Sequence, residues 1–261
     1  MDPAKILGTY VGSLSDSGER IRVEGASRVE LFDITYSDNQ TWGVSADGLG
    51  ASLELTDPAA TPADEIGKPY HWQAGTVFGG TPGQAIAAKP DIVINEIFAN
   101  SDAPNFDYIE LLNRGTSAVD IGNWFLSDNV DNRQKFRIPA GTVIAPGEYL
   151  VFDERSFNPA VDSGGNIGFG LSSSGEEVWL SYGTGSQTRF VDNVSFAASV
   201  DGQSYGLVPG ATDADVGRLI ASAARTPGAA NSAARVSSVV ISEVNYHPCL
   251  LYTSPSPRDR G

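Results

Sequence analysis

Cysteine and histidine are almost absent from this chain of 261 residues. The single cysteine is Cys249, and one cysteine can neither close a disulfide nor build a thiolate metal site within the chain. The two histidines are His71 and His247, so the stretch from residue 86 to 232 contains none. Because Ser-His-Asp catalysis needs a base beside its nucleophile, the sequence disfavours that mechanism.

Basic residues are also scarce. The chain carries 17 Lys and Arg against 32 Asp and Glu, which gives a net charge of −15, and it has no basic cluster. Such a surface repels phosphates and acidic lipid headgroups. No apolar run approaches the ~20 residues that span a bilayer, and no signal peptide follows Met1. We therefore expect no nucleic-acid partner and no membrane insertion.

Glycine, proline and short apolar runs are present instead, with 29 Gly and 15 Pro. The runs lie at residues 92–97 (IVINEI), 108–112 (YIELL), 124–126 (WFL) and 148–152 (EYLVF). They are rich in β-branched and aromatic residues and are bounded by Gly, Pro, Asn or Asp. This pattern predicts an all-β fold of short strands joined by tight turns.

Five pieces of sequence in a fixed order carry a family resemblance. They read INEI, DYIELLN, GNWFLSD, IPAGTVIAPGEYLVF and LSSSGEEVWL. In this order they resemble the lamin tail domain (LTD), a family found in animal nuclear lamins and in many bacterial secreted or surface proteins. The resemblance implies an immunoglobulin-like β-sandwich and an extracellular or cell-surface location. It implies less about function, because the family is defined by a domain and not by a chemical activity.

Several of these pieces recur along the chain. Residues 14–21 (LSDSGERI) match 171–178 (LSSSGEEV), 81–85 (TPGQA) match 226–230 (TPGAA), and 239–244 (VVISEV) match 92–97. We interpret the chain as tandem repeats. The expected parts are 1–85, the C-terminal half of a truncated repeat; 86–232, a complete domain; and 233–248, a linker and the first strand of a third repeat. Met1 is then expected to be an internal methionine.

The last 13 residues, 249–261, do not resemble the family. Translated back to codons, CLLYTSPSPRD resembles a transposase adapter used in sequencing libraries. We interpret this tail as an artefact, which would leave the natural fragment without any cysteine.

Side-chain alternation along the strands predicts the core. In residues 92–97, Ile97 is expected on the face opposite Ile94. In residues 122–128, Phe125 is expected to be partly exposed or at a sheet edge, because both its neighbours point inward. The residues predicted to form the core are Ile94, Ile109, Leu111, Trp124, Leu126 and Val178.

Two segments carry less regular patterns. In residues 211–225 the spacing of Val216, Leu219, Ile220 and Ala223 predicts a short helix, whereas the family resemblance implies an extended segment. The glycine-rich residues 164–170 lack the basic residue and the strand-then-helix setting of a phosphate-binding loop, so a plain connection is expected there.

Candidate chemistry is confined to carboxylates and amides. Glu96 and Glu110 could form a catalytic carboxylate pair, but strand alternation favours structural roles for both. Asp128, Asn129 and Asp131 crowd one loop together with Asn132, and oxygen ligands of this kind suit calcium. The spacing is not that of an EF-hand, and Asp and Asn also form ordinary turns. Calcium is thus the one cofactor that the sequence suggests.

The sequence therefore favours a non-catalytic binding, adhesion or spacer module of a large bacterial secreted or surface protein, with a protein or polysaccharide ligand. The alternative is a set of accessory domains in a secreted enzyme, such as a spore-coat-type kinase, a nuclease or a phosphatase. A nuclear scaffold is disfavoured by the negative charge and by the lack of a coiled-coil heptad pattern.

Overall fold

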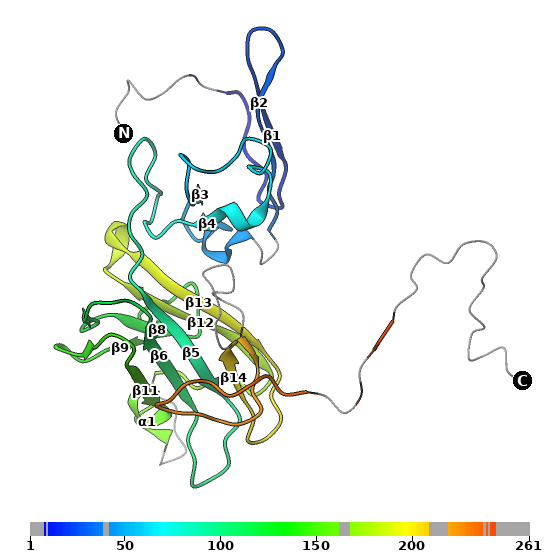
Figure 1. Ribbon diagram of the computed structural model, residues 1–261. Coiled ribbons are helices and arrows are strands. Elements are labelled where there is room, and N and C mark those ends of the chain that lie inside the picture. Colours follow the sequence, from blue (N-terminus) through cyan, green and yellow to red (C-terminus); the bar gives the residue numbers. More distant parts are fainter. Residues whose placement is uncertain are drawn as a thin grey trace, which may run out of the picture.

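A computed structural model describes residue 8 and residues 10–38, 42–161, 168–208, 219–236, 239 and 241–243. These residues form a β-sandwich and a smaller N-terminal unit that sits at one end of it (Figure 1). The five-stranded sheet has the order β11 (Tyr149–Asp153), β6 (Tyr108–Asn113), β5 (Ile92–Phe98), β14 (Ser204–Leu207), β15 (Leu219–Ala221). The four-stranded sheet has the order β13 (Arg189–Ala197), β12 (Gly175–Tyr182), β8 (Phe125–Ser127), β9 (Phe136–Arg137). All neighbouring strands run antiparallel.

Shorter elements complete the sandwich. They are the ribbon of β7 (Val119–Asp120) and β10 (Val143–Ile144), the helical turn α1 (Glu154–Phe157) and the 3₁₀ turn η6 (Gly185–Gln187). The chain is thus an all-β protein of immunoglobulin-like sandwich type, with one hydrophobic core between the two sheets. Ile94, Ile109, Leu111, Trp124, Leu126 and Val178 all lie in this core.

A bulge in β5 changes which of its residues face the core. The pairing register between β5 and β6 shifts between Ile94 and Glu96, which leaves Asn95 as the extra residue. A bulge moves every following side chain to the other face. Ile97 therefore joins Ile94 in the core, and the expectation that it points the opposite way is wrong.

The outer face of the four-stranded sheet is also covered. Phe125 was expected to be partly exposed or at an edge, yet β8 lies between β12 and β9 and Phe125 is buried. The loop after β8 folds back over this face, where the Ser127 hydroxyl donates to the carbonyl of Asn132 and the Arg133 guanidinium lies 5.2 Å from the centre of the Phe190 ring. Both faces of the strand are therefore covered.

The predicted helix in residues 211–225 is wrong where the structure describes it. Residues 219–221 form the edge strand β15, which pairs with β14 and so satisfies its backbone groups in a sheet. Residues 209–218 lie outside the described residues, as do residues 162–167 of the glycine-rich connection, residues 1–7 and the tail 249–261. Of the predicted third repeat, only residues 239 and 241–243 are described, and none of these is in a strand.

The N-terminal unit contains two small antiparallel ribbons. The first pairs β1 (Arg20–Glu24) with β2 (Glu30–Thr35), and the second pairs β3 (Leu53–Leu55) with β4 (Trp72–Ala74). The 3₁₀ turn η3 (Val44–Ala46) connects the two ribbons, and the 3₁₀ turn η4 (Pro69–His71) directly precedes β4. The aromatic rings of Phe32 and Trp72, 6.3 Å apart, join the two ribbons.

The β1–β2 hairpin repeats the geometry of β12–β13. Ile21 pairs with Ile34 as Val178 pairs with Val194, and the register shift after Val23 matches the one after Leu180. Before each hairpin the same turn forms, because a glutamate side chain accepts the N–H of the serine four residues earlier, in the pairs Glu19 with Ser15 and Glu176 with Ser172.

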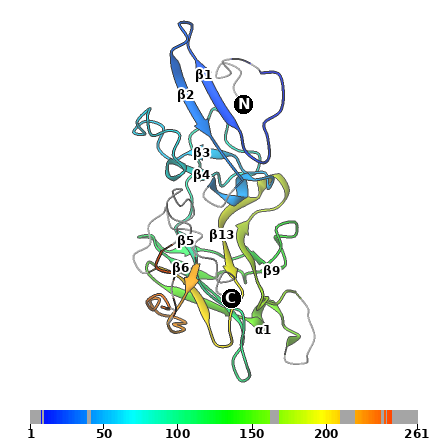
Figure 2. The same ribbon diagram turned by 90° about the vertical axis from the view of Figure 1, so that its right-hand side faces the viewer.

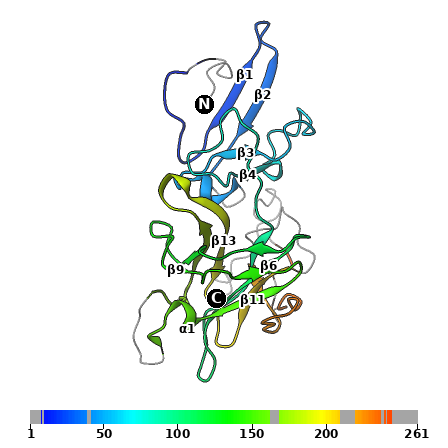
Figure 3. The same ribbon diagram turned by 90° about the vertical axis from the view of Figure 1, so that its left-hand side faces the viewer.

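Backbone hydrogen bonds attach the unit to the end of β13, as the side views show (Figures 2 and 3). The Phe190 N–H donates to the carbonyl of Thr76, the Phe78 N–H donates to that of Thr188, and Val77 forms a β-bridge with Arg189.

Candidate functional site

Two buried glutamates lie side by side on the outer face of the five-stranded sheet. Glu96 of β5 and Glu110 of β6 are paired across the two strands, and both are fully buried. The bulge at Asn95 places Glu96 on this outer face beside Glu110. Buried carboxylates need hydrogen-bond donors, because an unpaired charge is costly to remove from water.

The C-terminal segment 223–232 supplies most of those donors. The Glu96 carboxylate accepts the hydroxyl of Ser204 at 2.6 Å, and the N–H and hydroxyl of Thr226 at 3.1 and 3.3 Å. The Glu110 carboxylate accepts the N–H of Gly228 at 2.5 Å. We call the two glutamates and this segment the carboxylate clasp.

An amide pair completes the carboxylate clasp. Asn95 donates to Glu110 at 2.6 Å and to the side-chain oxygen of Asn231 at 2.9 Å. Asn231 in turn donates to the carbonyls of Asn95 and Leu207. The Arg225 guanidinium lies 4.4 Å from the centre of the Phe98 ring and so closes the same face. The segment thus covers an outer sheet face that would otherwise carry exposed charge.

Electrostatics in the carboxylate clasp follow from burial. Burial raises the pKa of Glu110, although its hydrogen bonds from Gly228 and Asn95 act in the opposite direction and the nearby Glu96 adds to the increase. Burial also raises the pKa of the Tyr108 hydroxyl beside it. The two carboxylates are therefore part of a structural network in which every carboxylate oxygen accepts a hydrogen bond.

The chemistry open to Glu96 and Glu110 is limited by those contacts. Each of their four carboxylate oxygens accepts a hydrogen bond from the chain itself. General acid or base catalysis requires a carboxyl group within reach of a substrate proton. The structural interpretation of this pair therefore fits the geometry better than the catalytic one.

Sequence reasoning identified Glu96 and Glu110 but not their partners, which lie up to 130 positions away in the chain. A signal for them existed, because the TPG motif occurs twice, at residues 81–83 and 226–228. In both copies the same turn forms, with the residue after the glycine donating its N–H to the threonine carbonyl at 3.0 Å.

The loop suggested for calcium holds its residues in other contacts. The Asp128 carboxylate lies 2.6 Å from the Lys135 ammonium. The Asn129 side-chain oxygen accepts the N–H groups of Asp131 and Asn132, which makes an ordinary Asx turn. Asp131 is exposed. Within the described residues, no three His, Cys, Asp or Glu side chains gather as a metal-binding group.

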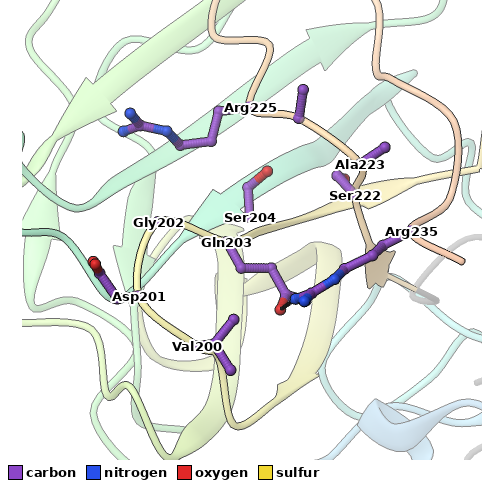
Figure 4. A pocket seen from close by; sticks show the side chains of 10 residues that line it. Val200, Asp201, Gly202, Gln203, Ser204, Ser222, Ala223, Arg225 and Arg235 are labelled. Carbon is purple, nitrogen blue, oxygen red and sulfur yellow. Dashed lines mark hydrogen bonds between the residues drawn. The ribbon is translucent and has the colours of Figure 1, made fainter. Parts of the chain in front are cut away.

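A shallow hollow lies beside the carboxylate clasp (Figure 4). It measures about 330 Å³, and its lining includes Asp201, Gln203, Arg225 and Arg235. Arg235 donates to the Gln203 side-chain oxygen at 2.6 Å. The volume is at the lower end of the range for small-ligand pockets, about 300 to 1,000 Å³.

Burial also raises the pKa of two further acids of the sandwich, Asp107 and Glu176. It raises the pKa of Asp107 to about 6, although the Ser101 N–H donates to this carboxylate at 3.0 Å. It likewise raises the pKa of Glu176 to about 6, where Asp128 and Asp107 add to the effect. The two carboxyl groups are therefore expected to change protonation state near pH 6.

No helix among the described residues is long and apolar enough to cross a membrane. Comparison with known proteins gives one positive result: residues 85–198 match the family model of the Lamin Tail Domain. Neither the curated proteins nor the solved structures provide a significant match. The matched segment begins just before β5 and ends just after β13, so it covers both sheets except for β14 and β15. Residues 85–198, which form most of the immunoglobulin-like sandwich, are therefore similar to the lamin tail domain family.

Proposed function

We propose that the chain is a segment of a non-catalytic binding, adhesion or spacer module in a large, bacterial-type secreted or cell-surface protein. The observation that carries this proposal is the carboxylate clasp. Its two glutamates are paired across neighbouring strands, and all of their carboxylate oxygens accept hydrogen bonds from the chain's own donors. The lamin tail domain, as a non-catalytic fold family, supports the same conclusion.

The tandem arrangement is part of this proposal. The matched register of β1–β2 and β12–β13, the matched glutamate turns and the two TPG turns support the interpretation of residues 1–85 as half of a second repeat. Stacked repeats of one domain would give an extended spacer.

The hollow beside the carboxylate clasp is the place where we expect a ligand. Its arginine, glutamine and aspartate side chains offer both donors and acceptors. This chemistry suits the hydroxyl groups of a polysaccharide or the polar loop of a protein.

Arrays of glycans and of extracellular-matrix proteins, probed with the labelled chain, test this function. We expect a ligand whose binding is weakened at least tenfold by Arg235→Ala and left unchanged by Arg137→Ala, which removes another exposed arginine. Kinase, nuclease or phosphatase turnover by the purified chain would contradict the proposal. A catalytic domain in the flanking reading frame would favour the accessory role instead.

A further inference from the structure

The edge of β3 in the N-terminal unit has the features of a site that accepts an additional strand. The β3–β4 ribbon has the register of β14–β15: the Gly75 N–H donates to the Ser52 carbonyl as the Ser222 N–H donates to the Ser204 carbonyl. Ser52 therefore corresponds to Ser204, and Glu54 corresponds to Gly206.

The two ribbons differ in which strand carries the glutamate that accepts hydrogen bonds from these serine and threonine hydroxyls. In the sandwich, the hydroxyls of Ser204 and Thr226 donate to Glu96, which belongs to the neighbouring strand β5. In the N-terminal unit, the equivalent hydroxyls of Ser52 and Thr81 both donate, at 2.9 Å, to Glu54 of β3 itself. Glu54 thus occupies the place that a glutamate from an adjacent strand takes in the complete domain.

Only one of the two carboxylate oxygens of Glu54 is hydrogen-bonded in this position. Its side chain is 9% exposed, and its second carboxylate oxygen is buried without a hydrogen-bond partner among the described residues. An unpaired buried carboxylate oxygen is costly. Release of Glu54 into water would therefore offset part of the cost of replacing it with another glutamate.

The second edge of β3 carries no strand among the described residues, because its sheet contains only β3 and β4. Ser52 and Thr56 bond to the β4 side, so the backbone N–H and carbonyl groups of Leu53 and Leu55 point to the other edge. A hollow of about 370 Å³ lies there, and its lining includes Pro58, Gly80, Pro82 and Ile86.

The first hairpin has an exposed apolar face that the same added strand would cover. Val23 and Leu31 are 46% and 61% exposed. By register they correspond to Leu180 and Val191, which are buried in the core of the sandwich. In the sandwich, β5 packs against β13 and also pairs with β14. A single strand equivalent to β5 would thus satisfy both the edge of β3 and the apolar face.

The chain itself contains a second segment of the β5 type. Residues 239–244 (VVISEV) repeat residues 92–97 (IVINEI), which places Glu243 at the position of Glu96 and Ile241 at that of the core residue Ile94. Ile241 is 83% exposed. Before this segment, Ala234 forms a β-bridge with Ser222 and the Arg235 N–H donates to the carbonyl of Ala221. The described residues 241–243 lie away from the sandwich (Figure 1).

We propose that β3 accepts residues 239–244 of a second copy of this chain as an added antiparallel strand. Glu243 of the second copy displaces Glu54 and accepts the Ser52 and Thr81 hydrogen bonds, in the register of β5 on β14. Ile241 covers Val23 and Leu31. Strand addition of this kind is an established mode of peptide recognition. The contact is head-to-tail, so it links copies into chains. This proposal does not depend on the proposed ligand-binding function.

Sedimentation velocity of the full chain, from micromolar to hundreds of micromolar, tests the proposal. We expect concentration-dependent association that Ile241→Asp abolishes. Val236→Asp, an equally exposed position outside the repeated hexamer, is the matched control and should leave association unchanged. Glu54→Gly, which introduces the residue found at the equivalent position 206, should strengthen association about tenfold, or ~1.4 kcal/mol.

A second measurement covers the case in which Glu54→Gly fails to fold. A labelled peptide of residues 237–246 should bind the Ile241→Asp chain, and binding should fall at least tenfold when the peptide carries Glu243→Ala or the chain carries Thr81→Val. A monomer at all concentrations, association that persists in Ile241→Asp, or equal binding of the two peptides would overturn the proposal. Compaction independent of concentration would show docking within one chain and would also overturn it.

Discussion

Leu180 of β12 and Val23 of β1 occupy the same position in two hairpins of identical register, yet Leu180 is in the core and Val23 is 46% exposed. The strand geometry of the two regions is the same down to the position of the bulge. The sandwich differs from the N-terminal unit because it has a second sheet, which contains β5 and covers the β12–β13 hairpin. Local sequence is thus sufficient to set the hairpin, whereas burial depends on the opposing sheet.

The carboxylates show the same difference between the regions. In the sandwich, Glu96 reaches across from a neighbouring strand and every oxygen is bonded. In the N-terminal unit, Glu54 turns back from its own strand and one oxygen is left without a bond. The carboxylate with both oxygens bonded thus lies in the region where two sheets face each other.

The largest expected effect is at the centre of the complete sandwich. Trp124→Ala should unfold it, because truncating a buried aromatic costs about 3 to 5 kcal/mol out of a domain stability of about 5 to 15. Trp124 stacks on Tyr182, with ring centres 5.1 Å apart. Tyr70→Ala removes an exposed aromatic of the N-terminal unit and should change little. Thermal melting followed by near-UV circular dichroism distinguishes the two, and equal melting temperatures would refute the prediction.

The next effect separates buried from exposed positions within the N-terminal unit. Ile34, which corresponds to Val194, is buried even there, and Ile34→Ala should cost about 2 to 5 kcal/mol of the unit's stability. Leu31→Ala, at an exposed position, should cost less than about 0.5 kcal/mol. Hydrogen exchange of the β1–β2 amides measures both. A large cost at Leu31 would mean that the hairpin is already covered in solution.

Most of the strand framework could be predicted from sequence, because periodicity reports which face of a strand is apolar. The six predicted core residues lie where alternation places them. The bulge at Asn95 could not be predicted in the same way, since its stabilising contacts come from Glu110 and Asn231, 15 and 136 positions away. The position of Ile97 was therefore missed, as were the donors of the carboxylate clasp.

A moderate effect concerns pH. The pKa values of Asp107 and Glu176 are raised to about 6, and those of Glu110 and Asp192 are also raised. Unfolded carboxyl groups titrate near pH 4, at about 3.9 to 4.3, so between these values the folded protein binds more protons than the unfolded one. The unfolding free energy should therefore fall as pH rises from about 4 through about 6, by on the order of 1 to 3 kcal/mol.

Asp107→Asn keeps an acceptor for the Ser101 N–H and removes one titrating group, so it should flatten the pH profile and stabilise the protein at neutral pH. Urea denaturation at a series of pH values provides the measurement. Stability that rises over this range in the natural chain would contradict the assigned direction of the pKa shifts.

A smaller effect tests calcium at Asp128, Asn129 and Asp131. Binding there would require the Asp128 carboxylate to leave Lys135. Extracellular calcium sites have dissociation constants of about 10⁻⁴ to 10⁻³ M, so millimolar calcium would stabilise the fold by about 0.4 to 1.4 kcal/mol. Melting in calcium, magnesium and chelator, with Asp128→Asn as the control, measures this shift. Equal melting temperatures in the three conditions would contradict calcium binding at this loop.

The last prediction is that the chain does not bind DNA. Arg133, Lys135 and Arg137 are the basic residues closest together in the sequence of the sandwich, and a DNA-binding patch would have to start from them. The Arg133 guanidinium lies against Phe190 and donates to the carbonyl of Val130, while the Lys135 ammonium pairs with Asp128. That leaves few charges for phosphates on a chain of net charge −15. Each neutralised phosphate contributes about 0.9 to the salt slope of DNA affinity, so a patch this small binds weakly and is easily screened. Fluorescence anisotropy with duplex DNA at physiological salt should show no binding, and micromolar or tighter affinity would restore a chromatin-like function.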